Sequence, residues 1–505
     1  MAHAGSRRAP AEVPGRVETV AHDRVLAGFP DVRQVTAAEV AARAAASGRT
    51  LVVLDDDPTG TQSVAGIPIL TEWTVADLRW AFAQPVPAFF VLTNTRSLTE
   101  DRAAARNREV VSAIVEAASL EHAGFVIASR SDSTLRGHYP LETDVIADEL
   151  LSAGGHSIDG VVFAPAYIDA GRLTVNSVHW ARTPDGLVPV GRSEFARDPA
   201  FGFRSSDLRE YVEEKTRGRW KAADVRAITL ADLRAGSLPA LTATLMSLEG
   251  GAPVVADAAA EEDLRVLALA IMDAEAAGKT FLYRVGPSFV RACAGLEPRP
   301  ALSAAEIAAI RGQGPGAGGP AAVSRNGLIV VGSHVGQTTR QLALLAGLDH
   351  LTHLELDVAR ALDETRRTAV TDALAGAAAE ALTRSDVVVK TSRTVVTGAD
   401  ANANLAIAQA VSDALVTVVR SVVGQIRPAW ILAKGGITSS EVATQGLGVR
   451  RAWVRGTLLP GMVSLWDPVD SRVPGTPYVV FAGNVGAEDS LAAVVTALRG
   501  DREQT

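Results

Sequence analysis

Three segments in the last third of the chain share one pattern: an apolar strand, a glycine corner and a polar helix start. They read LIVVGSHVGQTTRQL (328–342), AWILAKGGITSSEVA (429–443) and YVVFAGNVGAEDSL (478–491). This pattern is typical of a parallel α/β sheet. Backbone N–H groups at such a corner are free and the helix dipole adds partial positive charge, so each corner is suited to a phosphate. Three corners together predict a polyphosphate ligand.

A single corner of this kind is weak evidence, since any α/β protein needs glycine between a strand and a helix. Two of the three corners also carry the sequence of a capping box, Thr338 with Gln341 and Thr438 with Glu441. A capping box predicts a helix that begins directly after the glycines and leaves its first N–H groups facing the corner.

The second corner is the best candidate for contact with the β- and γ-phosphates. Two adjacent glycines permit a close approach of the backbone, and a threonine adds a hydroxyl group. The residues concerned are Gly435, Gly436, Ile437 and Thr438, and Ser333 of the first corner would add another hydroxyl.

The composition limits the partners of the chain. Its 505 residues are 47% hydrophobic and 21% charged, which suffices for two or three cores, and two domains is the default count. The formal net charge of −8 opposes binding to nucleic acid, because such sites need dense Lys and Arg. We therefore predict small-molecule ligands and no nucleic-acid partner.

Cysteine usage and hydropathy bear on the compartment. Cys293 is the only cysteine, so neither an intramolecular disulfide nor a Cys-based zinc site can form, as expected in a reducing cytoplasm. No stretch offers about 18 uncharged apolar residues, which predicts no membrane partner. We expect a cytoplasmic protein. The sequence does not fix the oligomeric state, and a homodimer is compatible with it.

Short apolar runs alternate with longer helical patterns from residue 51 onward. The runs are LVVLD, PAFFVLTN, GFVIAS, GVVFAPA, VRAITL, APVVADA and TFLYRVG, and residues 99–120 have a helical pattern. This alternation predicts an α/β fold with two doubly wound, mostly parallel-sheet domains that face each other across a cleft.

The stretch GQGPGAGGPAA (312–322) lacks apolar periodicity and predicts a flexible linker between the domains. We expect an N-terminal extension at 1–48, a first domain at 49–311, a linker at 312–326 and a second domain at 327–505.

Charged and polar residues stand at the ends of three successive strands of the first domain. Because the carboxyl ends of parallel strands meet at one edge of a sheet, we expect these residues to share one rim. They are Asp55, Asp56 and Asp57 after the first run, Asn94, Thr95 and Arg96 after the second, and Arg130, Ser131, Asp132 and Ser133 after the third.

This rim combines the groups that recognise a small hydroxy acid. An arginine fork suits a carboxylate or a phosphate, and the carboxylate of Asp56 or Asp132 can accept hydrogen bonds from hydroxyls or remove a proton. The alternative is that these residues are ordinary loop charges or salt-bridge partners. Their recurrence at consecutive strand ends favours a binding site.

Several other motifs fail on inspection. The run AEAAGKT (274–280) ends like a P-loop, but Asp273 stands where glycine is required. No strand-linked G-x-G-x-x-G with a downstream acid and no G-x-S-x-G nucleophile elbow occur. The histidines form no H-x-x-x-H pair, so we predict no zinc site and assign no metal ligands.

In order and spacing together, these residues resemble the four-carbon acid sugar kinase family over roughly residues 50–495. The resemblance is carried by Asp56-Asp57-Pro58-Thr59-Gly60, Asn94-Thr95-Arg96, Asp132-Ser133-Thr134-Leu135-Arg136-Gly137, Pro165 with Gly171-Arg172, Gly332-Ser333 with Thr338 and Gln341, Gly435-Gly436-Ile437-Thr438 and Gly483-Asn484-Val485-Gly486. Three features depart from the family pattern: the acid loop reads DDPTGT where DDLTGA is common, Arg130 replaces lysine, and Ile437 replaces Glu or Asp.

The resemblance implies an N-terminal substrate-binding domain and a C-terminal nucleotide-binding domain. It implies ATP- and Mg²⁺-dependent phosphorylation of a hydroxyl on a tetronate-type acid such as threonate, erythronate or a 3-oxo-tetronate. It also implies residue roles: Asp56, Arg96, Arg130, Ser131, Asp132 and Ser133 would hold the acid sugar, and Ser333, Gly435, Gly436, Ile437, Thr438 and Gly483 would hold ATP.

We expect a mechanism in which Arg96 or Arg130 clamps the carboxylate of the acid sugar and Asp56 is the general base, with Asp132 as the alternate. Phosphoryl transfer has a loose transition state, so positioning and neutralisation of charge dominate catalysis. Closure of the domains about the linker would exclude water. Two alternatives stay open: an NAD(P)-dependent hydroxy-acid dehydrogenase, and a non-catalytic nucleotide- or sugar-acid-binding protein.

Overall fold

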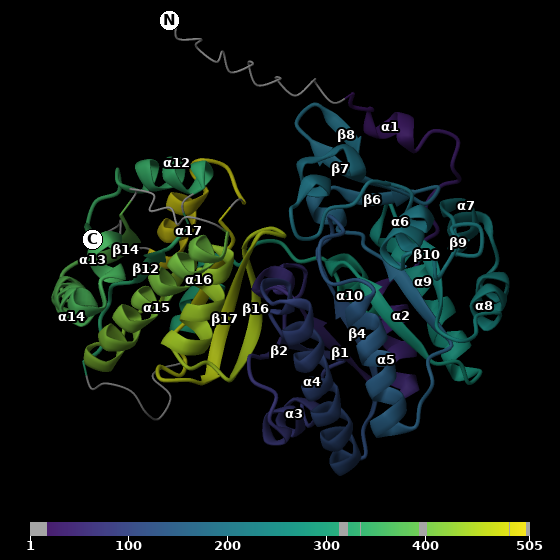
Figure 1. Cartoon of the computed structure of the whole chain (residues 1–505), viewed down its shortest axis with the longest axis horizontal. Coiled ribbons are helices and arrows are strands. Elements are labelled where there is room, and N and C mark those ends of the chain that lie inside the picture. Colours follow the sequence, from purple (N-terminus) through teal and green to yellow (C-terminus); the bar gives the residue numbers. More distant parts are fainter. Residues whose placement is uncertain (1–17, 313–321, 334, 393–400, 484, 501–505) are drawn as a thin grey trace, which may run out of the picture.

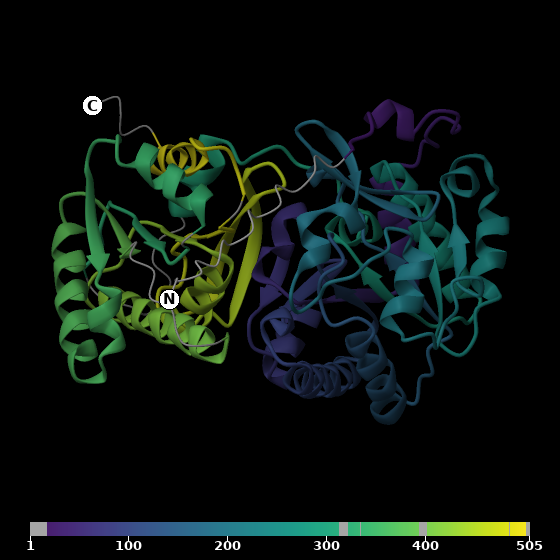
Figure 2. The same cartoon turned by 45° about the horizontal axis from the view of Figure 1, so that its top comes forward.

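The computed structural model describes residues 18–312, 322–333, 335–392, 401–483 and 485–500. They form two lobes that lie side by side, one from the N-terminal part of the chain and one from the last third (Figures 1 and 2). Each lobe is a mostly parallel sheet with helices on both faces, so the predicted α/β class is confirmed. Most of the predicted linker, residues 313–321, lies outside the described residues. No helix among those described is long and apolar enough to cross a membrane.

The sheet of the N-terminal lobe is entirely parallel, with the strand order β2-β3-β1-β4-β11-β5-β10-β9. All seven apolar runs of the first domain are strands. The bounds are β1 Arg49–Asp55, β2 Ile67–Leu70, β3 Ala88–Leu92, β4 Gly124–Arg130, β5 Gly160–Ala164, β9 Arg226–Ile228, β10 Ala252–Ala256 and β11 Phe281–Val285.

These strands are continuous apolar runs because both faces of the sheet are covered. In β3, Phe89 packs on the face covered by α3, α4 and α5, and Phe90 packs on the face covered by α2, α9 and α10. The helices are α2 Ala37–Ser47, α3 Val75–Phe82, α4 Glu100–Glu121, α5 Leu141–Gly154, α9 Glu261–Ala276 and α10 Pro287–Cys293.

The sheet of the C-terminal lobe has the order β13-β14-β12-β15-β18-β17-β16, with the first five strands parallel and the last two antiparallel. The three strands of the glycine corners, β12, β15 and β18, are adjacent. The bounds are β12 Leu328–Val331, β13 Leu351–Leu356, β14 Asp386–Thr391, β15 Ile431–Lys434, β16 Arg451–Leu459, β17 Val463–Asp470 and β18 Tyr478–Phe481. The flanking helices are α12 Gly336–Leu345, α14 Glu364–Ala381, α15 Ala401–Gln425 and α17 Ser490–Arg499.

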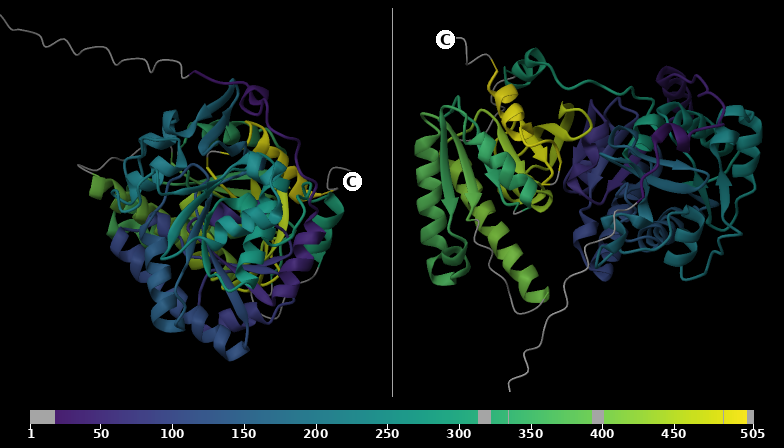
Figure 3. Two further views of the ribbon diagram at one scale, coloured as in Figure 1. Left: turned by 90° about the vertical axis from the view of Figure 1, so that its right-hand side faces the viewer. Right: turned by 90° about the horizontal axis from the view of Figure 1, so that it is seen from above.

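The two sheets are not separate. Strand β2 of the first lobe pairs antiparallel with β16 of the second, with Leu70 opposite Arg451 and Ile67 opposite Val454. The result is one fifteen-stranded sheet that runs through both lobes, and Figures 1 and 3 show the two lobes meeting along this pair. On one face of the sheet, a single apolar core includes residues of both lobes.

The acid loop itself adds to this interface. Its 3-10 helix η1 (Pro58–Ser63) packs against the β16–β17 hairpin, where Trp466 Nε1 donates to Thr61 Oγ1 at 3.0 Å and Gln62 Nε2 donates to the Met462 carbonyl at 2.7 Å. A free swing of the lobes about the linker, as the sequence suggests, would break these contacts and the β2–β16 pair. A movement of the lobes that keeps these contacts must bend the shared sheet.

A small antiparallel sheet lies between β5 and β9 in the chain. It consists of β6 (Arg172–Val175), β7 (Val178–Thr183) and β8 (Gly186–Pro189). Buried His179 of β7 lies with Nε2 2.7 Å from the Ser133 carbonyl oxygen. The small sheet thus supports the loop that follows β4.

Asp77 on α3 closes the seam between the lobes, and its substitution tests how much the seam contributes. This buried carboxylate accepts from Arg450 Nη2 at 2.8 Å and from Arg451 Nε at 2.7 Å. We expect Asp77→Asn to lower the free energy of unfolding by roughly 1–3 kcal/mol, because charge-assisted hydrogen bonds of a buried group are lost. Denaturant unfolding measures the change.

The matched control is Glu72→Gln, since Glu72 pairs with the same Arg450 at 3.2 Å but is exposed. We expect that change to cost less than about 1 kcal/mol. Equal effects of the two substitutions would contradict a special role of the buried carboxylate.

Candidate active site

The loops that follow β1, β3 and β4 meet at one edge of the N-terminal sheet. Strand β1 lies between the other two, with Asp55 opposite both Leu92 and Arg130. Because parallel strands end at the same edge, Asp56 accepts hydrogen bonds from both Arg96 and Ser131, which come from the other two loops. The expectation that these residues share one rim is therefore met.

Arg96 pairs with two carboxylates of the rim that the loops after β1, β3 and β4 form, called here the acidic rim. Its Nη2 lies 2.5 Å from Asp56 Oδ1, its Nε lies 3.3 Å from Asp56 Oδ2, and its Nη1 lies 3.4 Å from Asp57 Oδ2. Burial opposes the charge of Arg96, but Asp56 and Asp57 raise its pKa well above the ordinary value. Burial likewise opposes ionisation of Asp57, and the charges of Arg96 and Arg130 lower its pKa. Arg96 and Asp57 are thus charged at neutral pH.

Arg130 and Asp55 form a buried ion pair behind this rim, with Arg130 Nη2 2.6 Å from Asp55 Oδ1. Burial raises the pKa of Asp55, and the charge of Arg130 opposes this rise. Gly60 of the acid loop packs directly on the pair: a Cβ added there would lie 1.8 Å from Arg130 Nη2 and 2.0 Å from Asp55 Oδ2. The glycine of the acid loop is therefore required by space, since no larger residue fits beside the pair.

Asp132 pairs with a different arginine. Arg136 Nε donates to Asp132 Oδ2 at 2.6 Å, and Thr134 donates to the same oxygen. Burial opposes ionisation, but Arg96 and Arg136 lower the pKa of Asp132 to about 2. A carboxylate with so low a pKa is a weak proton acceptor.

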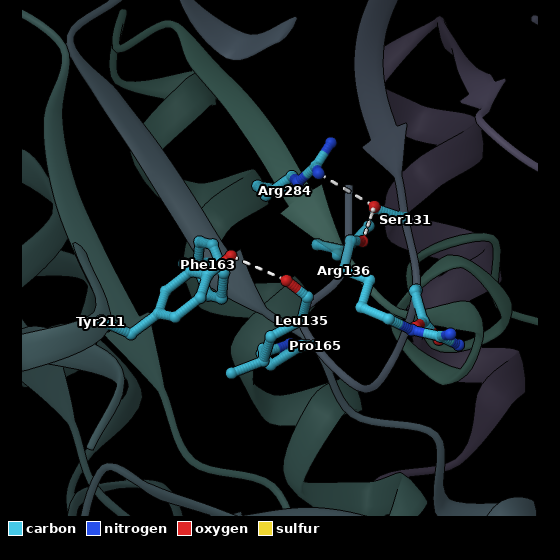
Figure 4. A pocket seen from close by; sticks show the side chains of 9 residues that line it. Ser131, Leu135, Arg136, Phe163, Pro165, Tyr211 and Arg284 are labelled. Carbon is cyan, nitrogen blue, oxygen red and sulfur yellow. Dashed lines mark hydrogen bonds and ion pairs between the residues drawn. The ribbon is translucent and has the colours of Figure 1, made fainter. Parts of the chain in front are cut away.

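The pocket beside Asp132 is too small for a sugar acid. Figure 4 shows its wall, in which Arg284 faces Ser131 and the Tyr211 hydroxyl reaches the Leu135 carbonyl. The donor distances are 2.9 Å from Arg284 Nη2 to Ser131 Oγ and 2.8 Å from the Tyr211 hydroxyl to the carbonyl oxygen. The pocket has a volume of about 10 Å³, which is room for at most one water molecule.

The three glycine corners of the C-terminal lobe converge. Thr338 Oγ1 donates to the Gly483 carbonyl at 2.9 Å and lies 3.1 Å from Ser333 Oγ. Gly435 has a φ of +126°, which an L side chain rarely adopts, and a Cβ there would lie 3.0 Å from Thr438 Oγ1. The predicted ATP-binding residues of the three corners therefore lie together.

The two predicted capping boxes are wrong. Helix α12 begins at Gly336 and α16 (Gly436–Glu441) begins at Gly436, so Thr338 and Thr438 lie inside the first turns and neither helix has a side-chain cap. Gln341 donates instead to the carbonyls of Val485 and Ala487, and Glu441 accepts from Ser412 and Gln409. These side chains hold neighbouring segments in place, which stabilises the corners by tertiary contacts.

A cleft of about 890 Å³ lies between the two lobes. This volume is within the range of small-molecule sites. Its wall includes Asp56, Asp57, Asn94 and Arg96 from the first lobe and Gly436, Ile437, Ser440 and Glu441 from the second. Asn94 Nδ2 donates across the cleft to Ser440 Oγ. The acidic rim and the second glycine corner therefore face the same space.

The other predicted site residues lie near this wall but are not part of it. Arg130, Ser131, Asp132 and Ser133 are buried or half-buried behind the rim, and Ser333, Gly435, Thr438 and Gly483 form the converging corners beside Gly436. Arg96 also lines a second cleft of about 880 Å³, together with His138, Lys215 and Arg219.

Two charged residues of the site were not predicted from the sequence. Arg284 of β11 is buried and donates to Glu142 Oε2 at 2.6 Å as well as to Ser131. Lys434 is the last residue of β15 and is fully buried beside the second and third corners. Arg284 interrupts an otherwise apolar strand and Lys434 ends one, and a lone charge in such a run is the signal in the sequence.

The cleft wall offers carboxylates that could bind Mg²⁺. Across the described ranges, no three His, Cys, Asp or Glu side chains come together as a metal site. Magnesium at phosphate sites is usually held by one or two carboxylates together with the phosphates and water. Asp56 and Asp57 on the cleft wall fit that pattern, and Asp57 is the more exposed of the two.

Two family descriptions match the chain. Residues 51–293 match a sugar-binding N-terminal domain, and residues 328–491 match a nucleotide-binding C-terminal domain. A protein of Methylobacterium radiotolerans named 3-oxo-tetronate kinase is 30% identical over 188 residues, which are 37% of this chain and 40% of that protein. The match therefore spans less than half the length of the curated relative.

Two solved structures share the fold. A protein of Salmonella typhimurium LT2, described as a candidate tRNA synthase, has a TM-score of 0.62 and 20% identity, covering 90% of this chain and 99% of its own. A Haemophilus influenzae protein has a TM-score of 0.58 and 19% identity, covering 88% of this chain and 98% of its own. At these identities the likeness extends to the fold alone.

Proposed function

The chain belongs to the four-carbon acid sugar kinase family, and from that premise we propose that it transfers the γ-phosphoryl group of Mg-ATP to a hydroxyl of a four-carbon acid sugar. The acceptor would be of the threonate, erythronate or 3-oxo-tetronate type. The observation that carries the proposal is the shared cleft, in which Asp56 and Arg96 of one lobe face Gly436 of the other.

We assign the carboxylate of the acid sugar to Arg96. The guanidinium has five N–H donors, and its contacts with Asp56 and Asp57 use three of them. Arg96 lines the cleft, whereas Arg130 is buried against Asp55. Arg130 therefore supports the acid loop, and Ser131, Asp132 and Ser133 position Asp56 and Arg96 from behind.

Asp56 is the stronger candidate for the general base. It lines the cleft, where an acceptor hydroxyl would lie, and Ser131 Oγ at 2.6 Å orients its Oδ2. Asp132 lines the small pocket instead and is held by Arg136. Because the transition state of phosphoryl transfer is loose, the base mainly orients the hydroxyl and accepts its proton late.

The phosphates of ATP are assigned to the converging corners, where Gly436 faces the cleft and the hydroxyls of Ser333 and Thr438 lie close by. A Cβ at Gly436 would meet nothing within 4 Å, so its backbone borders open space. Mg²⁺ carried by the nucleotide would neutralise charge on the transferring group, with Asp57 as the carboxylate ligand on the cleft wall.

The test is a coupled assay of ADP release with Mg-ATP against a panel of four-carbon aldonic and keto-aldonic acids. We expect release that depends on one acid and that saturates. A parallel thermal-shift experiment compares Mg-ATP with NAD(P). Stabilisation by NAD(P) alone, with no ADP release for any acid, would refute the kinase and favour a dehydrogenase.

Gly483 provides a test of the nucleotide site. A Cβ at this position would lie 2.7 Å from Ser333 Oγ, so Gly483→Ala must displace the Ser333 hydroxyl. We expect the Kd for Mg-ATP to rise roughly tenfold, as overpacking costs about 1–3 kcal/mol, with little change in KM for the acid. Isothermal titration calorimetry measures the Kd.

Gly376→Ala in helix α14 is the matched control, since its Cβ would meet nothing within 4 Å. It should leave ATP binding unchanged. If Gly483→Ala bound ATP like the control, the third corner would have no part in the nucleotide site.

A further inference from the structure

Lys434 is an unusual residue in this lobe. Its side chain is fully buried, and Nζ donates to the Ala482 carbonyl at 3.0 Å and lies 3.8 Å from the centre of the Phe481 ring. Within the described ranges, no carboxylate comes within 4.0 Å of this ammonium group. A buried charge without a partner is costly, so the lysine needs an explanation.

Among the described residues, the charged groups on the elements around Lys434 have other partners. On α12, Arg340 pairs with Glu488 at the surface, and on α16, Glu441 is bound by Ser412 of α15. On α17, Arg499 pairs with Asp386 of β14, and β12 contributes only apolar residues. Tyr478 of β18 donates its hydroxyl proton to the Ser439 carbonyl.

The position of Lys434 suggests what the missing counter-charge is. Its own carbonyl accepts from Gly332 N at 3.4 Å, the next residue is Gly435, and its ammonium is bonded to the residue before Gly483. Lys434 is thus tied to all three glycine corners, to the first two through its backbone and to the third through its side chain. The partner that these corners are built to receive is a polyanion.

We propose that Lys434 supplies the buried counter-charge for the phosphates of the nucleotide, and that nucleotide binding takes up a proton at this lysine. The inference rests on the proposed function of the cleft. Lys434 is a positioning residue: its charge acts through the carbonyl of Ala482 and the corner that follows it. The free protein holds the lysine partly neutral, and the bound polyanion holds it charged.

The direction of the pH dependence follows from the surroundings. Burial lowers the pKa of Lys434 to about 7 in the free protein, and a nearby phosphate raises the pKa of the bound state. Protons are therefore taken up between these two values. In that window the affinity for nucleotide falls as the pH rises, by at most tenfold for each pH unit.

The test is calorimetry with a non-hydrolysable Mg-ATP analogue at pH 7.5, in Pipes and in Tris, whose heats of ionisation differ. We expect the wild type to take up a substantial fraction of one proton per nucleotide. Lys434→Met should abolish this uptake and weaken binding roughly 10–100-fold, as expected for a hydrogen bond of a charged group. Lys434→Arg should abolish the uptake, because guanidinium does not titrate here.

Thermal unfolding separates this role from a structural one. Methionine removes a buried charge, so Lys434→Met should be at least as stable as the wild type without nucleotide. Lys279→Met is the matched control: Lys279 lies in the other lobe, paired with Asp159, and should keep both uptake and affinity. Nucleotide binding without proton uptake by the wild type, or uptake retained in Lys434→Met, overturns the Lys434 inference and leaves the kinase standing. No binding by the wild type overturns both.

Discussion

Replacing Asp56 by asparagine is expected to lower kcat by roughly 10²–10⁴-fold, the usual contribution of a general base. Asparagine keeps the size of the side chain and an acceptor for Ser131, whose hydroxyl lies 2.6 Å from Asp56 Oδ2. It removes the charge that orients the acceptor hydroxyl and takes its proton. Because the phosphates are assigned to the glycine corners and Mg²⁺ to Asp57, the Kd for Mg-ATP should change little.

The measurement is steady-state ADP release with the acid at saturation, together with the Kd for Mg-ATP. Asp467→Asn is the matched control, since Asp467 is a buried carboxylate that accepts from Arg455 but does not line the cleft. It should keep near-normal turnover. Near-normal turnover of Asp56→Asn under the same conditions would rule out Asp56 as the base.

Gly60→Ala is expected to destabilise the N-terminal lobe strongly. Its Cβ would fall 1.8 Å from Arg130 Nη2 and 2.0 Å from Asp55 Oδ2, so the ion pair must separate. Breaking a buried pair costs roughly 3–5 kcal/mol, far more than the gain of up to about 1 kcal/mol from a less flexible unfolded chain. The acid loop would move with Arg130, so turnover should fall as well.

Denaturant unfolding of Gly60→Ala measures the effect, with Gly424→Ala as the control. Gly424 lies in α15, where a Cβ meets nothing within 4 Å, and its replacement should stabilise the helix slightly. A stability of Gly60→Ala close to that of the wild type would show that Arg130 can leave Asp55 without cost.

The sequence predicts the strands and the convergence of the rim because both depend on local pattern. Continuous apolar runs are typical of strands buried on both faces. The carboxyl edge of a parallel sheet then brings Asp56, Arg96 and Ser131 together without further information. The same reasoning places the three glycine corners next to one another once β12, β15 and β18 are adjacent.

The features that the sequence does not predict depend on partners far along the chain. Thr338 and Glu441 have the spacing of capping residues, yet tertiary acceptors and donors at Gly483 and Ser412 bind them instead. Strand β2 is only four residues long, and its composition does not predict that it pairs with β16. The role of Asp56 as general base stays a prediction, which the turnover of Asp56→Asn tests.

The pairing of β2 with β16 also bears on how the chain matures. Either lobe made alone would expose an unpaired, apolar sheet margin with free N–H and C=O groups, which is a template for aggregation. During synthesis, β2 emerges almost 400 residues before β16 completes the sheet. The edge of β2 in the first lobe therefore stays unpaired until β16 has been synthesised.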